Sequence, residues 1–217
     1  MVRLSDSGRI AKPKRLAVVM CTMNQSENLL PADGLAFLFE NWLSSEKEDL
    51  FRSLAKEVDW KQDEVIMFGK RITMRRLTAW YGDEPFDYTY SQVSRQALPW
   101  TKTLAEIKSE AEKVSGETFN SCLLNFYHDG EDYMGWHSDD EPELNPNASI
   151  ASVSLGAERK FAFKHKRSKE TVSTFLTNGS VLLMKPPTQE HWLHTLRKSK
   201  KVGEPRINLT FRRILIS

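Results

Sequence analysis

Residues 206–212 read Arg-Ile-Asn-Leu-Thr-Phe-Arg, and apolar and polar side chains alternate along the whole stretch. Alternation with a period of 2 predicts a β-strand whose two faces have different surroundings. The polar face carries Arg206, Asn208, Thr210 and Arg212. If that face looks outward, water satisfies the two arginines. If it looks into the protein, a bound carboxylate must be present to accept their hydrogen bonds.

The same alternation recurs after Gly116, between turns rich in Gly, Pro, Asn and Asp. It predicts strands at residues 119–127, 150–155, 160–165, 172–177, 180–184 and 206–216. Residues 64–70 and 86–91 are expected to add outer strands or a hairpin. Several short strands without intervening helices indicate a sandwich, jelly roll or barrel rather than a parallel α/β sheet.

The pattern before Gly116 is helical from Asp33 onward, and Ser45 with Glu48 forms a possible capping box. The apolar face that follows consists of Leu50, Phe51, Leu54, Ala55 and Val58. A second helix is predicted between Pro99 and Gly116. Its apolar positions are Leu104, Ile107, Ala111 and Val114. We expect both helices to buttress the sheet.

The composition suits a soluble globular protein of one domain, since 40% of the 217 residues are hydrophobic. Cys21 and Cys122 show no metal-like or redox-like spacing, which excludes a disulfide framework and favours a reducing compartment. No apolar run approaches the roughly twenty residues that span a bilayer, and residues 1–15 lack the apolar segment of a signal peptide. The sequence therefore predicts a cytoplasmic or nuclear protein with no membrane partner.

The formal net charge of +2 is too small to indicate nucleic-acid binding by itself. The basic residues nevertheless cluster at 9–15, 164–169 and 197–201, whereas 40–64 and 131–143 are acid-rich. These basic runs are either solvated loops or contacts to an anionic partner.

His137-Ser138-Asp139 could supply two ligands to one metal, because residues i and i+2 of an extended chain point the same way. A third ligand must come from a distant strand, and both His191 and His194 are candidates. Two histidines and one carboxylate would form a facial triad that leaves open positions on Fe(II). The alternative is a turn-forming aspartate beside a surface histidine.

Asn125 and Tyr127 share one face of a predicted strand, with Phe126 opposite, and offer hydrogen-bond donors for an acid. An ordinary half-buried strand shows the same alternation. These residues alone leave both interpretations open.

Four segments strongly resemble the AlkB dealkylating dioxygenases: NFYHDGEDYMGWHSDDE (125–141), SIASVSLGAERKFAFKHK (149–166), HWLHTL (191–196) and PRINLTFR (205–212). The likeness runs in order from about residue 64 to the C-terminus and is closest to the homologues that repair duplex DNA. It implies a mostly β fold with α, built on a double-stranded β-helix (jelly-roll) core. The single catalytic domain would span 32–217, with helical support and substrate hairpins at about 32–118, the core at about 119–217, and a mobile arm at 1–31.

The resemblance also implies the site residues and the cofactors Fe(II), 2-oxoglutarate and O2. The metal ligands would be His137, Asp139 and His194, which selects His194 over His191. The distal carboxylate of 2-oxoglutarate would meet Asn125, Tyr127 and Arg206, and its iron-chelating end would be surrounded by Asn208 and Arg212. The implied reaction couples decarboxylation of 2-oxoglutarate to succinate with hydroxylation of N-alkyl groups on 1-methyladenine or 3-methylcytosine, which releases formaldehyde and repairs the DNA directly.

A methylated base inside a duplex must be extruded before it can react, and something must fill the gap. By resemblance, Phe68 would be the intercalating residue; the alternative is a core residue of an edge strand. Tyr88 and Tyr90 match the aromatic positions that contact the extruded base, although any buried strand shows such alternation. Asp140 and Glu141 would contact the cationic base or organise the site; the alternative is that both are solvated turn residues. Relatives commonly have Pro-Arg where this chain has Arg75-Arg76, so we assign the substrate-facing role to Arg76 and a possible phosphate contact to Arg75.

The expected partner is alkylated DNA, in duplex form, acted on by a monomer. Single-stranded DNA, RNA or protein are alternative substrates for the same chemistry. A non-catalytic jelly-roll binding module is the alternative from a different functional class.

Overall fold

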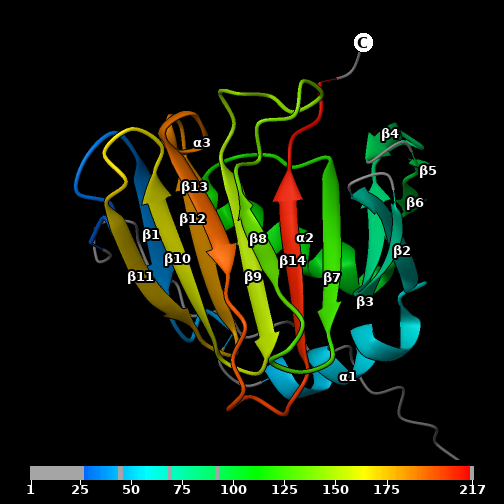
Figure 1. Ribbon diagram of the computed structural model, residues 1–217. Helices are drawn as coiled ribbons and strands as arrows, with labels where there is room; N and C mark the ends of the chain where they lie inside the picture. Colours follow the sequence, from blue (N-terminus) through cyan, green and yellow to red (C-terminus); the bar gives the residue numbers. More distant parts are fainter. Residues whose placement is uncertain (1–26, 44–45, 68–69, 91–92, 216–217) are drawn as a thin grey trace, which may run out of the picture.

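Two mainly antiparallel sheets form the centre of the molecule (Figure 1). The computed structural model describes residues 27–43, 46–67, 70–90 and 93–215, and only the backbone pairing of residues 63–67, 70–72, 87–90 and 93–95. The major sheet has the order β1 (Leu35–Phe39), β12 (Ser180–Lys185), β9 (Ile150–Gly156), β14 (Arg206–Arg212), β7 (Ser121–Tyr127), β3 (Lys70–Gly82), β2 (Lys61–Met67), and β6 (Leu98–Pro99) pairs with β3.

The minor sheet has the order β11 (Thr171–Leu176), β10 (Arg159–His165), β13 (Trp192–Leu196), β8 (Met134–His137). A separate two-stranded ribbon joins β4 (Asp87–Tyr90) to β5 (Val93–Gln96). The helices are α1 (Lys47–Glu57), α2 (Lys102–Ser115) and the single turn α3 (Thr188–His191). This architecture confirms the predicted jelly-roll fold with N-terminal helices. Within the described residues, no helix is long and apolar enough to cross a membrane.

β14 lies between β9 and β7 and is buried along its whole length. Its apolar residues Ile207, Leu209 and Phe211 join the core cluster that includes Leu104 and Ile107 of α2. Each such side chain contributes about 1.5–3 kcal/mol by leaving water. Because that apolar face is covered by helices, the polar face of β14 must look toward the minor sheet, and its residues line a cavity there. The inward alternative for the arginines is therefore the correct one.

Helix α2 lies between Pro99 and Gly116, as the sequence predicts, and its N-cap is Thr101. The hydroxyl oxygen of Thr101 accepts a hydrogen bond from the backbone N–H of Leu104 at 3.2 Å, which caps the first turn. Gly116 ends the helix with φ of 72°, a left-handed conformation that glycine adopts without steric strain.

The first predicted helix differs in its start. It begins at Lys47, and Glu46 occupies the N-cap position without a side-chain capping bond, while Ser45 of the predicted capping box lies outside the described residues. Residues 35–39 form β1 rather than helix. This short apolar run has no clear period, and its backbone pairs with β12 in the major sheet. The last strand ends at Arg212, earlier than the predicted residue 216.

The N-terminal boundary is described from Glu27 onward, so the predicted arm at 1–31 stays a prediction. The side-chain oxygen of Asn28 accepts hydrogen bonds from the backbone N–H groups of Leu30 and Ala36. Leu30 is 3% exposed and packs in the cluster between the two sheets.

Candidate metal centre and acid-binding cavity

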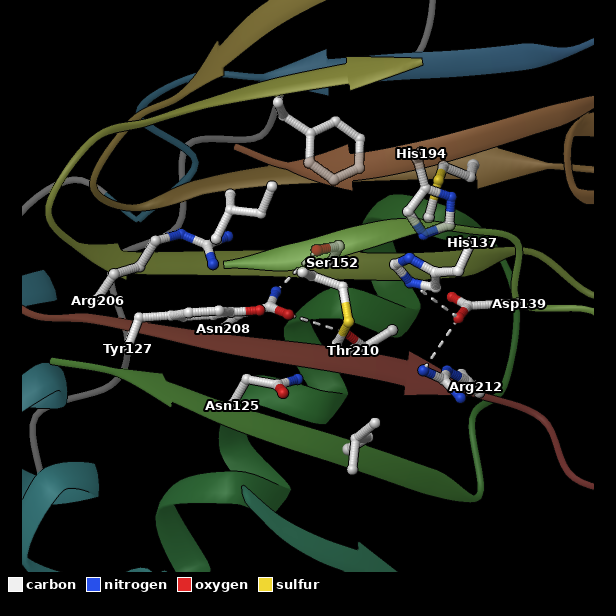
Figure 2. Close-up of a pocket in the computed structure, with 15 residues that line it drawn as sticks. Asn125, Tyr127, His137, Asp139, Ser152, His194, Arg206, Asn208, Thr210 and Arg212 are labelled. Carbon is white, nitrogen blue, oxygen red and sulfur yellow. Dashed lines mark hydrogen bonds and ion pairs between the residues drawn. The ribbon is translucent and has the colours of Figure 1, made fainter. Parts of the chain in front are cut away.

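A cavity lies between the two sheets, with possible metal ligands at one end and an arginine at the other (Figure 2). Its lining combines residues of both sheets: Leu123, Asn125, Tyr127, Met134, His137, Asp139, Ser152, Phe161, Met184, His194, Leu196, Arg206, Asn208, Thr210 and Arg212. All the residues predicted to bind metal or the keto acid are among them.

His137, Asp139 and His194 converge because β8 and β13 pair with His137 directly opposite His194. The two imidazole centroids are 4.2 Å apart, and Nε2 of His137 lies 3.9 Å from Oδ1 of Asp139. One ligand atom from each of the three residues lies within 4.8 Å of the others, and no other such group of three or more occurs among the described residues.

The hydrogen bonding of His137 and the burial of His194 both favour metal binding. Nδ1 of His137 is 2.9 Å from the carbonyl oxygen of Gly135, which makes Nδ1 the donor and leaves Nε2 with its lone pair in the neutral ring. His194 is 4% exposed and packs against Phe161, with ring centroids 5.5 Å apart. Burial, and then the neighbouring His137, lowers the pKa of His194 to about 3, so its ring is neutral. Its Nδ1 is buried without a hydrogen-bond partner among the described residues.

Asp139 is held from two sides. Its backbone N–H donates to Oε1 of Gln189 at 2.9 Å, and its Oδ1 lies 3.2 Å from Nη2 of Arg212. Burial would raise the pKa of this carboxyl, but the positive charge of Arg212 lowers it overall. Two imidazoles beside one carboxylate are a donor set that fits a divalent metal such as Fe(II).

The opposite end of the cavity requires an anion. Arg206 is 2% exposed, and its Nη2 donates to Oγ of Ser154 at 2.9 Å, while its Nε is buried without a partner among the described residues. No carboxylate in the described part of the chain forms an ion pair with it. Burial lowers the pKa of Arg206 to about 10. A buried guanidinium in this state is stabilised by a ligand carboxylate.

Three other predicted acid-binding residues lie between these ends. The guanidinium carbon of Arg206 is 5.3 Å from the ring centroid of Tyr127. Asn208 donates from Nδ2 to Oγ of Ser152 at 2.8 Å and accepts from Oγ1 of Thr210 at 3.1 Å, so its amide is held in place. Asn125 is 3% exposed.

The residues predicted to meet a substrate are only partly described. Arg76 is 5% exposed, and its Nε donates to Oδ1 of Asn125 at 3.0 Å, so it lies against the acid-binding residues. Phe68 lies outside the described residues. Tyr88 and Tyr90 belong to β4, and their side chains also lie outside the description.

The two predicted carboxylates after the metal ligands differ in their contacts. Asp140 is exposed and accepts hydrogen bonds from Oγ of Ser138 at 2.8 Å and Nζ of Lys166 at 3.3 Å. Glu141 lies 3.9 Å from Nη1 of Arg212.

Arg75 has protein partners. Its guanidinium lies 2.9 Å from Oδ2 of Asp129 and 3.5 Å from Oδ1 of Asp132. These carboxylates already bind the guanidinium that the sequence suggested as a phosphate contact.

Sequence reasoning missed Gln189, whose side chain holds Asp139, and Phe161, which packs on His194. An isolated glutamine in a short helical turn carries no periodic signal. Phe161 stood in a predicted strand, but only the pairing of β10 with β13 shows that it reaches a metal ligand.

Comparisons with known proteins agree with this geometry. The family model described as the 2OG-Fe(II) oxygenase superfamily matches residues 36–212. The Mus musculus protein named DNA oxidative demethylase ALKBH2 is 43% identical over 182 residues, covering 79% of this chain and 76% of the relative. The Homo sapiens protein of that name is 42% identical over 184 residues, covering 80% and 70%.

More distant matches extend the comparison. The Homo sapiens alpha-ketoglutarate-dependent dioxygenase alkB homolog 3 is 38% identical over 179 residues, covering 78% of this chain and 62% of the relative. The solved structure of OsALKBH1 covers 82% of this chain and 96% of its own, with a TM-score of 0.57 and 16% identity, and so supports the fold alone.

Proposed function

Because the chain belongs to the 2OG-Fe(II) oxygenase superfamily and, within it, to the AlkB family, we propose that it oxidatively demethylates N-alkylated bases in DNA. Family membership confirms the predicted cofactors, Fe(II), 2-oxoglutarate and O2. The observation that carries the proposal is the single cavity that joins a two-histidine, one-carboxylate cluster to a buried arginine without a carboxylate partner among the described residues.

His137, Asp139 and His194 would hold the iron. When bound, iron with 2-oxoglutarate and O2 supplies the oxidant for the N-alkyl group, at the expense of 2-oxoglutarate, which leaves as succinate and carbon dioxide. Burial keeps the ring of His194 neutral and Arg212 lowers the pKa of Asp139, so both groups are suited to binding a metal cation.

A linear acid with a carboxylate at each end matches the charge distribution of the cavity. Arg206 and Tyr127 would bind the distal carboxylate, and the amide of Asn125 would add a donor because Arg76 already occupies its oxygen. Arg212 lies beside Asp139 at the metal end, where the chelating carboxylate would sit (Figure 2). Asn208, held by Ser152, would orient the chain between the two ends.

The alkylated base would approach from the side of Asp140 and Glu141, whose carboxylates suit the positive charge of 1-methyladenine or 3-methylcytosine. Tyr88 and Tyr90 would stack against the base, Phe68 would fill the gap in the duplex, and Arg76 would link this region to Asn125. We further propose a duplex preference, a monomeric state and a cytoplasmic or nuclear location.

The decisive experiment measures formaldehyde and succinate released from matched 1-methyladenine oligonucleotides as duplex DNA, single-stranded DNA and RNA. Wild-type protein with Fe(II), ascorbate and 2-oxoglutarate should release both products, fastest from the duplex. Asp139→Ala should release neither, because it removes the only carboxylate of the triad. Arg52→Met, an exposed change on α1, is the matched control and should keep full activity.

Absence of turnover on every alkylated nucleic acid would refute the substrate class. Equal turnover of duplex and single strands would refute the duplex preference alone. Static light scattering of the same preparation tests the monomer.

A further inference from the structure

Arg159, the first residue of β10, is a fully buried arginine with no part in the proposed chemistry. It is 1% exposed. Its Nη1 donates to the carbonyl oxygen of Asp129 at 3.1 Å, and its Nη2 to those of Gly130, Asp132 and Arg197 at 3.4, 2.7 and 2.8 Å. All four acceptors are backbone oxygens, and the nearby carboxylates of Asp132 and Asp129 partly offset the effect of burial, which lowers the pKa of Arg159 overall.

The four carbonyls belong to two loops that meet at one end of the jelly roll. Residues 128–133 connect β7 to β8, and residues 197–205 connect β13 to β14. The backbone N–H of Gly130 donates to the carbonyl oxygen of Val202, and the carbonyl oxygen of Gly130 accepts from the N–H of Ser199, at 2.8 Å each. A Cβ atom at Gly130 would collide with the carbonyl oxygen of Ser199, so the loops approach as closely as the backbone allows.

These loops join directly to the proposed acid-binding residues. Tyr127 is the last residue of β7, Arg206 is the first of β14, and the two are paired across the sheet. The guanidinium carbon of Arg159 lies 5.9 Å from the ring centroid of Tyr127, and that of Arg206 lies 5.3 Å from the same ring. Arg159 therefore contacts both the backbone that carries this pair and the ring that belongs to it.

The two guanidinium groups beside this ring repel each other, although Asp132 and Asp129 offset part of the charge of Arg159. An acid that brings a second carboxylate to Arg206 relieves this repulsion, whereas an acid without that carboxylate leaves it unchanged. The charge of Arg159 thus favours dianionic over monoanionic ligands, in addition to the mechanical effect of its hydrogen bonds.

We propose that Arg159 is a positioning residue for the dicarboxylate cosubstrate, which clamps the two loops so that Tyr127 and Arg206 meet the distal carboxylate. The inference rests on the proposed function, because it takes 2-oxoglutarate as the ligand of this cavity. It assigns to β10 a role in selecting the cosubstrate.

The test compares two ligands by isothermal titration of Mn(II)-loaded protein. 2-Oxoglutarate carries the distal carboxylate, and 2-oxopentanoate lacks it. Arg159→Gln should weaken binding of 2-oxoglutarate about ten-fold and change that of 2-oxopentanoate by less than about two-fold. Arg159→Lys should fall between wild type and Arg159→Gln, because it keeps the charge and loses the fork of hydrogen bonds.

Equal weakening of both acids would mean that Arg159 has only a general structural role, and unchanged binding of 2-oxoglutarate would also overturn the proposal. The Lys variant decides the question if the Gln variant does not fold. Arg52→Met serves as the control and should bind both acids as wild type does.

The two proposals fail in different ways. Wild-type protein that binds 2-oxoglutarate with the expected dependence on Arg159 but does not demethylate DNA leaves the positioning role intact and refutes the proposed substrate. The positioning role alone is refuted if wild-type protein demethylates DNA and the Arg159 variants bind 2-oxoglutarate and 2-oxopentanoate with the wild-type ratio of affinities.

Discussion

Replacing Arg206 with methionine is expected to stabilise the ligand-free protein while abolishing its binding of 2-oxoglutarate. Burial lowers the pKa of Arg206 from its ordinary value to about 10, so the folded state holds this proton less tightly than the unfolded state. At neutral pH both states are protonated, and the shift appears in full as a destabilisation of about 3 kcal/mol. Loss of the hydrogen bond to Ser154 offsets about 1–1.5 kcal/mol of the gain.

The net stabilisation of Arg206→Met is therefore about 1.5–2 kcal/mol, which raises the melting temperature by about 3–8 °C. Differential scanning fluorimetry with Mn(II) measures it directly. Saturating 2-oxoglutarate, at about 100 times its Kd, should stabilise the wild type by about 2.7 kcal/mol and the variant not at all.

A variant that melts several degrees below wild type, or that keeps the rise caused by 2-oxoglutarate, would refute the reasoning. The first result would mean that the buried charge is neutralised within the protein, and the second that the acid binds elsewhere. Arg52→Met, whose side chain is 72% exposed, should change stability by less than about 0.5 kcal/mol.

Three further predictions concern stability and metal binding. The pKa of His194 is about 3 in the folded protein and 6.5 in the unfolded chain, so the metal-free protein should lose stability as pH falls from 6.5 toward 3. His194→Gln should flatten this pH dependence in urea unfolding between pH 5 and pH 8, and an unchanged slope would contradict the prediction. Gly130→Ala should lower stability by more than about 2 kcal/mol because of the contact with Ser199, and a melting temperature equal to wild type would show that the loop can move aside. Gln189→Leu should weaken metal binding about 10–100-fold by freeing the backbone of Asp139, and titration with Mn(II) that gives the wild-type Kd would exclude this support.

The local elements, and the chemistry they could carry, follow from short segments of the amino-acid sequence. Alternation along residues 206–212 identified a strand with one polar face, and the spacing of His137 and Asp139 allowed both to meet one metal. Pro99 and Gly116 stood on either side of the amphipathic run that forms α2. Each of these signals lies within one segment, where periodicity and capping act on neighbouring residues.

The choice among these possibilities depends on how distant segments pack together. The face of β14 that carries Arg206 looks inward because helices cover the opposite face, and His194 lies opposite His137 because β8 pairs with β13 in that register. No pattern in the sequence predicted strand β1, the hydrogen bond from the backbone of Asp139 to Gln189, or the bonds from Arg159 to loop carbonyls. The physical reason is that these features require pairing and hydrogen bonds between residues far apart along the backbone, several of them to carbonyl oxygens that every residue possesses.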